Sequence, residues 1–259
     1  SILSVPVLVI RRVEDVSQGR LSKKGILSVA AYINYENEIN LSTNELREIL
    51  DICEVNGLDV KDGSSVFRRK PQEVREIIEL CNLYGIRLDG GTIFRCKPEN
   101  IKPIVDVCSE LGIDYKNSIL VFHRTVDEIK DIVQVCKKYG IDYQDGGNIF
   151  YKTADEIIRL VQVCEECGIN YQTSGMIYTT NIEDISDVVK VCRKYGIKYQ
   201  DGGMVFKRNA LEIEEIVEVC EKYNINYKNG GVLFGRTADE IEEIVSFCIE
   251  NGIKYQDVS

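Results

Sequence analysis

Apolar residues recur at helical spacing in the segment from Thr125 to Gly140. They are Ile129, Ile132, Val133, Val135, Cys136 and Tyr139. This stripe is wider than contact with one neighbour requires, so it predicts a helix packed between two others. The segment begins with Thr125 and Glu128, a capping box typical of helix N-termini. It ends at Gly140, the residue type that most readily adopts the left-handed conformation of a helix C-cap.

The same pattern returns about every 28 residues along the chain. Cysteines mark the period at Cys53, Cys81, Cys108, Cys136, Cys164, Cys192, Cys220 and Cys248, and every gap is 28 residues except the 27 from Cys81 to Cys108. The expected helix ends are Gly57, Gly85, Gly112, Gly140, Gly168, Gly196, Asn224 and Gly252. Such a period is typical of stacked repeats, in which each unit buries its apolar face against its neighbours.

A second, shorter element is predicted after each long helix. One column holds residue types that favour helix N-caps: Asp62, Asp89, Asn117, Asp145, Thr173, Asp201 and Asn229. In the repeat from Thr125 to Lys152 the short helix is expected over Gly146 to Tyr151, with Ile149 and Phe150 facing the core. We therefore predict an all-α solenoid of about eight 28-residue helix-turn-helix repeats, each a long helix plus a short helix, over residues 41–259.

The two ends of the chain depart from the repeat pattern. Residues 1–40 do not fit it, and we expect an N-terminal capping segment in which Gly25 to Ile33 form a helix over the first repeat. Residues Gln256 to Ser259 stand where another short helix would begin. Either the array was cut there, or its last face meets another molecule, which leaves end-to-end self-association through the C-terminal repeat as one hypothesis.

Composition excludes several classes of function. With 44% hydrophobic and 29% charged residues and no apolar run near the ~18 residues of a membrane span, the sequence favours a soluble protein. Ten cysteines at packing positions favour free thiols in a reducing, cytoplasmic compartment. The pair Cys164 and Cys167 lacks the further ligands of a zinc site. With one histidine and no phosphate-cradling glycine loop, we expect no catalytic residue, metal or cofactor.

Two adjacent columns at the junction of short and long helix are the candidate site. The first forms a basic ladder, defined by Arg69, Arg124, Lys152, Arg208 and Arg236, with Cys96 and Thr180 at the two other positions. The second, the variable column, is polar at most positions and reads Arg68, Arg95, His123, Tyr151, Thr179 and Lys207, with Gly235 last. A cation in each unit beside a helix N-terminus suits phosphate groups, and a varying polar neighbour suits unit-by-unit base reading.

The ladder has an alternative explanation. Most of its members precede a helix whose first turn is acidic, as Asp155 and Glu156 follow Lys152. Local ion pairs then account for the column, although exposed pairs contribute little to stability. A tyrosine column, with Tyr143 as an example, offers stacking platforms for bases or packs at the edge of the core.

The sequence resembles two families of nucleic-acid-binding helical repeats. The segment Pro98–Ile113, PENIKPIVDVCSELGI, is similar to the long-helix half of a mitochondrial transcription termination factor repeat. The alternation of short and long helices with variable residues between them is similar to TAL-effector repeats. The resemblance implies an α-solenoid that binds DNA or RNA. The proline of the first family appears only as Pro71 and Pro98, and the residue pairs of the second are absent, so no base is assigned.

Two hypotheses of function follow. The first is a non-enzymatic nucleic-acid-binding repeat protein, in which the ladder contacts phosphates and the variable column faces bases. Its difficulty is charge, because the whole chain carries −10, and residues 1–40, with five basic and four acidic side chains, leave the repeats near −11. The second is a protein-protein interaction scaffold that binds a peptide or partner domain on its concave face.

Overall fold

A computed structural model describes residues 41–58, 63–88, 91–173 and 175–255. Within these ranges the chain is all-helical, and eight α-helices alternate with short 3-10 helices. The α-helices are α3 (Thr43–Val55), α4 (Pro71–Tyr84), α5 (Pro98–Leu111), α6 (Val126–Tyr139), α7 (Ala154–Cys167), α8 (Ile185–Tyr195), α9 (Ala210–Tyr223) and α10 (Ala238–Glu250). The 3-10 helices are η1 (Gly63–Arg68), η2 (Gly91–Arg95), η3 (Leu120–His123), η4 (Asn148–Tyr151), η5 (Ile177–Thr179), η6 (Ile182–Asp184), η7 (Met204–Lys207) and η8 (Val232–Gly235).

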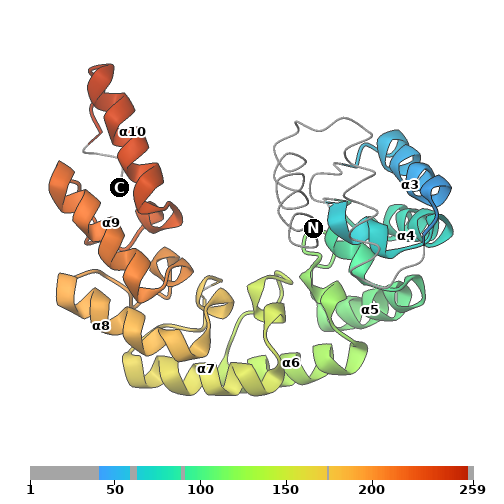
Figure 1. The fold of residues 1–259 in the computed structure, drawn as a ribbon. Helices are drawn as coiled ribbons and strands as arrows, with labels where there is room; N and C mark the ends of the chain where they lie inside the picture. The colour runs from blue at the N-terminus through green and yellow to red at the C-terminus, as the bar shows by residue number, and fades with distance from the viewer. Residues whose placement is uncertain (1–40, 59–62, 89–90, 174, 256–259) are drawn as a thin grey trace, which may run out of the picture. The chain divides into compact units, whose positions relative to one another are not determined.

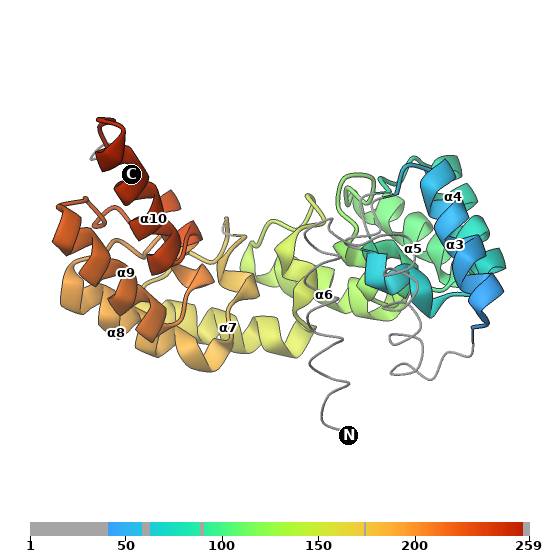
Figure 2. The ribbon, with the colours of Figure 1, turned by 45° about the horizontal axis from the view of Figure 1, so that its top comes forward.

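The chain divides into two compact units. Unit 1 contains the described residues up to Ile129 together with Gln144–Gly146, and unit 2 contains Lys130–Tyr143 and the described residues from Gly147 onward. In unit 1, α4 packs between α3 and α5 (Figure 1). In unit 2, α7, α8, α9 and α10 pack one against the next in chain order, as Figure 2 shows from a second direction. This sequential packing confirms the predicted all-α repeat array.

The predicted helix ends are confirmed by the backbone. All eight predicted end residues have a positive φ, and Asn224, at 55°, is the one non-glycine residue in the described part of the chain that does. The capping box is also found where it was expected. In α7, Thr153 accepts a hydrogen bond from the Glu156 amide at 3.3 Å, and the Glu156 carboxylate accepts one from the Thr153 amide at 2.7 Å.

The short second element differs from the prediction. It is a 3-10 helix, and in the repeat used as the example it begins at Asn148, two residues later than expected. From η3 onward the predicted N-cap column does not supply the N-cap, which is Gly147 in η4, Gly203 in η7 and Gly231 in η8, while Asp62 and Asp89 lie outside the described residues. Instead Asp201 accepts from the Gly203 amide at 3.0 Å and Asn229 accepts from the Gly231 amide at 3.1 Å, so each side chain closes a turn two residues on.

A glycine is required in this turn because two main chains approach closely there. Gly146 has a φ of 64°, and a Cβ at this position would lie 2.7 Å from the Asp114 carbonyl oxygen. The same loops are joined by main-chain hydrogen bonds between repeats, such as Asn170 N to the Gln200 carbonyl at 2.7 Å and Lys198 N to the Lys228 carbonyl at 2.8 Å. Consecutive repeats are therefore tied at their loops as well as through their helices.

The core has the same composition in every repeat. All eight cysteines of the repeat column are buried, which confirms their packing role. Every 3-10 helix from η1 to η8 except η6 contributes a buried aliphatic residue followed by a buried aromatic one, for example Val205 and Phe206. The helix expected over Gly25 to Ile33 and the segment Gln256 to Ser259 lie outside the described residues. None of the helices described here has the length and apolar composition needed to cross a bilayer.

Candidate functional site

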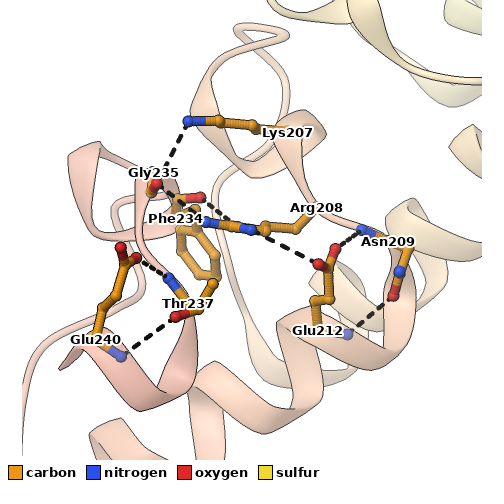
Figure 3. Close-up of polar contacts among 8 residues, drawn as sticks. All are labelled: Lys207, Arg208, Asn209, Glu212, Phe234, Gly235, Thr237 and Glu240. Atoms are coloured by element: carbon orange, nitrogen blue, oxygen red, sulfur yellow. Dashed lines mark hydrogen bonds and ion pairs between the residues drawn. The ribbon is translucent and has the colours of Figure 1, made fainter. Parts of the chain in front are cut away.

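One ladder arginine of unit 2, Arg208, joins two repeats (Figure 3). Arg208 follows η7, and its side chain extends to the end of η8 in the next repeat. Its Nε donates to the Phe234 carbonyl and its Nη2 to the Gly235 carbonyl, both at 3.0 Å. Its Nη1 lies 3.6 Å from the Glu212 carboxylate, and only 12% of the side chain is exposed. The planar guanidinium thus donates to two carbonyls at the end of η8 and faces one acid in the first turn of α9.

The same contacts occur in unit 1 at Arg69. Its Nε donates to the Phe94 carbonyl at 2.8 Å and its Nη2 to the Arg95 carbonyl at 2.7 Å. Its Nη1 lies 3.6 Å from Glu73, and 14% of the side chain is exposed. Two arginines in different units therefore bind the turn of the following repeat in the same register.

Other ladder positions use shorter versions of this link. The Lys152 ammonium donates to the Thr180 carbonyl at 2.8 Å. Thr180 itself stands in the ladder column, is buried, and donates to the Phe206 carbonyl at 2.6 Å. Arg124 lies 3.4 Å from Glu128 with 14% of its side chain exposed. Arg236, the last member of the ladder, is exposed instead.

The variable column lies on the surface. Arg68, Arg95, Tyr151, Thr179 and Lys207 are all exposed. Some are also held by the fold: the Arg95 Nε donates to Ser65 at 3.2 Å, and the Lys207 ammonium donates to the Gly235 carbonyl at 3.4 Å.

His123 is the variable-column residue with a distinct environment. It is half-buried, and its Nε2 is a buried atom without a hydrogen-bond partner. Burial lowers the pKa of the imidazole, and the positive charges of Arg95 and Arg124 lower it further. The ring is therefore neutral near neutral pH and adds no positive charge to the surface beside these arginines.

The tyrosine column packs against the repeats. Tyr199 and Tyr227 are buried. The Tyr227 hydroxyl donates to Glu221 at 3.0 Å, and the Tyr171 hydroxyl donates to Glu165 at 3.1 Å. With one face buried and the hydroxyl bonded, these rings match the packing alternative for the column.

An apolar pocket of about 160 Å³ opens in the last repeat that the structure describes. It is lined by Ile225, Val232, Leu233, Arg236, Ile241, Ile244, Val245 and Tyr255. Val232 is 67% exposed. Sequence reasoning missed this pocket, because its residue types are those of buried positions in the earlier repeats.

Among the described residues the potential metal ligands do not cluster, and the cysteines of the repeat column are buried. No group of three or more potential metal ligands occurs in the described ranges. Burial raises the pKa of Cys164 to about 12, so this thiol is protonated near neutral pH. No protein-family model, curated protein or solved structure matches the chain. The resemblance to the two nucleic-acid-binding families therefore stays a prediction.

Proposed function

We propose that this protein is a non-enzymatic helical repeat protein that binds a protein partner. The observation that carries the proposal is the apolar pocket of unit 2, with Val232 exposed at its side and Arg236 at its edge. An open apolar pocket beside a single cation suits an apolar segment that also presents hydrogen-bond acceptors. The apolar residues of this lining offer no charge or hydrogen-bond donor to the phosphate backbone of a nucleic acid.

The hydrogen bonds of the basic ladder also favour a protein partner over a nucleic acid. Arg69 and Arg208 each donate to two main-chain carbonyls and face an acid, and little of either side chain is exposed. A phosphate would have to displace these bonds before it could pair with either guanidinium. The net charge of −10 adds long-range repulsion of a polyanion.

Photo-crosslinking in the native host tests this function. A photoreactive amino acid replaces Val232, and the matched control carries it at Leu211 on α9, an apolar residue with nearly the same exposure, 65% against 67%. We expect a protein adduct at position 232 that is absent at position 211 and disappears when Ile244→Asp is added. Equal adducts at both positions, or none at 232, would contradict the proposal.

Nucleic-acid binding remains a second candidate because of one specific observation, the exposed arginines Arg68 and Arg95 in unit 1. These residues of the variable column, rather than the ladder, would contact phosphates. Electrophoretic mobility shift at low salt tests this with single- and double-stranded probes. A shift that weakens steeply with salt and is lost in the Arg68→Ala, Arg95→Ala double variant supports it, and an unchanged shift in that variant rejects it.

A further inference from the structure

The arginines of the basic ladder show how this fold holds a guanidinium group. Each is surrounded by three acceptors: the carbonyl of the buried aromatic residue in the next 3-10 helix, the carbonyl that follows it, and the acid four residues after the arginine. Around Arg208 these are Phe234, Gly235 and Glu212, and around Arg69 they are Phe94, Arg95 and Glu73 (Figure 3 shows the first set). The same three acceptors therefore bind a guanidinium in two separate units.

Thr180 occupies the ladder column but is too short to reach all three acceptors. Its hydroxyl donates to the Phe206 carbonyl at 2.6 Å, which is the first of them. The second, the Lys207 carbonyl, accepts no hydrogen bond from the described residues. The third, the Asp184 carboxylate, is exposed and has neither an ion pair nor a hydrogen bond with the described part of the chain. Two of the three groups that hold a ladder arginine are thus available to a ligand in this repeat.

An open polar pocket of unit 2, about 240 Å³ in volume, lies at this place. Its lining includes Thr180, Asp184, Phe206 and Lys207, the residues that correspond to a ladder arginine and its three acceptors. The pocket therefore presents to solvent the acceptors that an arginine of the chain binds at the equivalent place in two other repeats.

The cations beside the polar pocket do not prevent a guanidinium from binding there. The Lys207 ammonium lies 3.4 Å from the Gly235 carbonyl, and Arg208 donates to carbonyls of the same next repeat. Unit 1 gives a direct precedent, because the Arg95 carbonyl accepts from Arg69 although Arg95 itself carries a positive charge. Lys207 stands at the position equivalent to Arg95.

We infer that the polar pocket binds a guanidinium group, presented as an arginine side chain by a protein partner. The class of partner rests on the function proposed above, whereas the chemistry of the ligand rests on the ladder arginines alone. The planar fork of the ligand donates to the Phe206 and Lys207 carbonyls, and the Asp184 carboxylate balances its charge. The Phe206 oxygen keeps its bond from Thr180, because a carbonyl oxygen has two lone pairs. An ammonium group is a poorer ligand, because it lacks the fixed fork that matches two adjacent carbonyls.

Titration of the full chain with the capped tripeptide acetyl-Gly-Arg-Gly-amide, followed by proton–nitrogen correlation NMR, tests the inference. We expect the Arg208 amide to shift with a Kd on the order of 1 mM, because this amide shares a peptide group with the Lys207 carbonyl. The Arg236 amide is the internal control and does not shift, since the Gly235 carbonyl of its peptide group already accepts from Arg208. The matching lysine tripeptide binds about tenfold more weakly.

Variants of the chain locate the binding site. Thr180→Arg places a guanidinium of the chain itself in the pocket and abolishes binding of the arginine peptide. Asp184→Asn weakens binding about tenfold, because the charged acceptor is lost. Glu183→Gln is the matched control: it removes the same charge from the neighbouring residue, which lies 3.9 Å from Arg159, and leaves the Kd unchanged. The inference is overturned if the arginine peptide leaves the Arg208 amide unshifted, or if the lysine peptide binds equally well.

A second measurement needs no ligand. Thr180→Arg should raise the urea midpoint of unfolding, because the new side chain makes the contacts that Arg208 makes in the next repeat, and adding Asp184→Asn should remove part of the gain. Thr179→Arg adds the same charge at the exposed neighbouring position and leaves the midpoint unchanged. An unchanged or lower midpoint in Thr180→Arg contradicts the fit of a guanidinium to this pocket. The peptide titration stands by itself if Thr180→Arg does not fold, because Asp184 is an exposed residue.

Three outcomes separate the inference from the proposed function. A crosslinked protein at Val232 without binding of the arginine peptide overturns the inference and leaves the function standing. Peptide binding without a crosslinked protein confirms the guanidinium site and contradicts the function. Tighter binding of free arginine than of the capped tripeptide assigns the pocket to a small guanidinium compound and overturns the inference of a protein partner.

Discussion

At the scale of single residues, the ladder shows how one side chain type serves a structural role in a position that suits ligand binding. Arg69 and Arg208 use the fixed fork of the guanidinium to bind two adjacent carbonyls that end a 3-10 helix. These carbonyls have no partner within their own helix. An arginine in this column therefore donates hydrogen bonds to carbonyls of the next repeat. Its contribution to stability depends on whether that repeat is present.

The pair Arg208 and Arg236 tests this dependence. Arg208→Ala removes the charged donor of the Phe234 carbonyl and leaves the Gly235 carbonyl with the longer bond from Lys207, and we expect a loss of about 2 kcal/mol in the free energy of unfolding. Arg236→Ala removes an exposed side chain and should leave the free energy of unfolding unchanged. Urea unfolding followed by circular dichroism measures both. Equal losses in the two variants would show that the bonds of Arg208 to the η8 carbonyls contribute nothing.

The buried cysteines give a prediction for pH. Burial raises the pKa of Cys53 to about 11 and that of Cys192 to about 12, whereas an unfolded thiol titrates near 8.5. Because the unfolded state loses its thiol protons first, the contribution of these thiols to stability is constant below about pH 8.5 and falls as the pH rises above it. Urea midpoints at pH 7 and about pH 10 measure the fall, and Cys53→Ala should reduce it. A midpoint that rises with pH would contradict the assignment.

At the scale of elements, the long helices have strong local signals at both ends. Capping boxes begin α3, α7, α9 and α10, and a left-handed residue follows each long helix. These signals involve residues only a few positions apart, so they can be recognised in the sequence. The short element is different, because its geometry depends on a turn that fits against the loop of the neighbouring repeat.

Asn224 tests the left-handed C-cap of α9. Its φ of 55° is tolerated by Asn, costs nothing for Gly, and is unfavourable for other residues by about 1–2 kcal/mol. Asn224→Ala should therefore destabilise the protein by about 1 kcal/mol, while Asn224→Gly changes stability by a few tenths at most. Chemical denaturation of the two variants side by side makes the comparison. If Ala and Gly behave alike, the left-handed conformation is not what position 224 requires.

At the scale of the whole molecule, stability comes from contacts between neighbouring repeats. Within unit 2, α9 is covered by α8 on one side and α10 on the other, whereas α10 borders the apolar pocket beside the half-buried Ile244. In arrays of this kind each interface contributes separately, so a repeat with one open face is the first to open.

Hydrogen exchange measures this difference directly. We expect the amides of α10 from Ile241 to Cys248 to exchange faster than those of α9 from Ile213 to Cys220, although both segments are helical. Binding of a partner in the pocket should slow exchange in α10 selectively. Mass spectrometry of peptic fragments resolves the two helices. Equal protection in both would mean that the open face has no energetic consequence.

The sequence alone determined the repeat, the long helices, their caps and the buried cysteines. All of these depend on residues within one period, and the helical spacing of apolar positions reports burial wherever neighbours are alike. Only the tertiary structure decided where the ladder side chains point, because an arginine beside an acid in sequence can equally reach carbonyls 25–27 residues away. It also decided that the second element is a short 3-10 helix. In the example repeat this helix begins only after Gly146, because Gly146 lies in a turn where two loops approach closely. The pocket beside Ile244 is likewise visible only in the tertiary structure, because the exposure of a residue depends on its neighbours and not on its type.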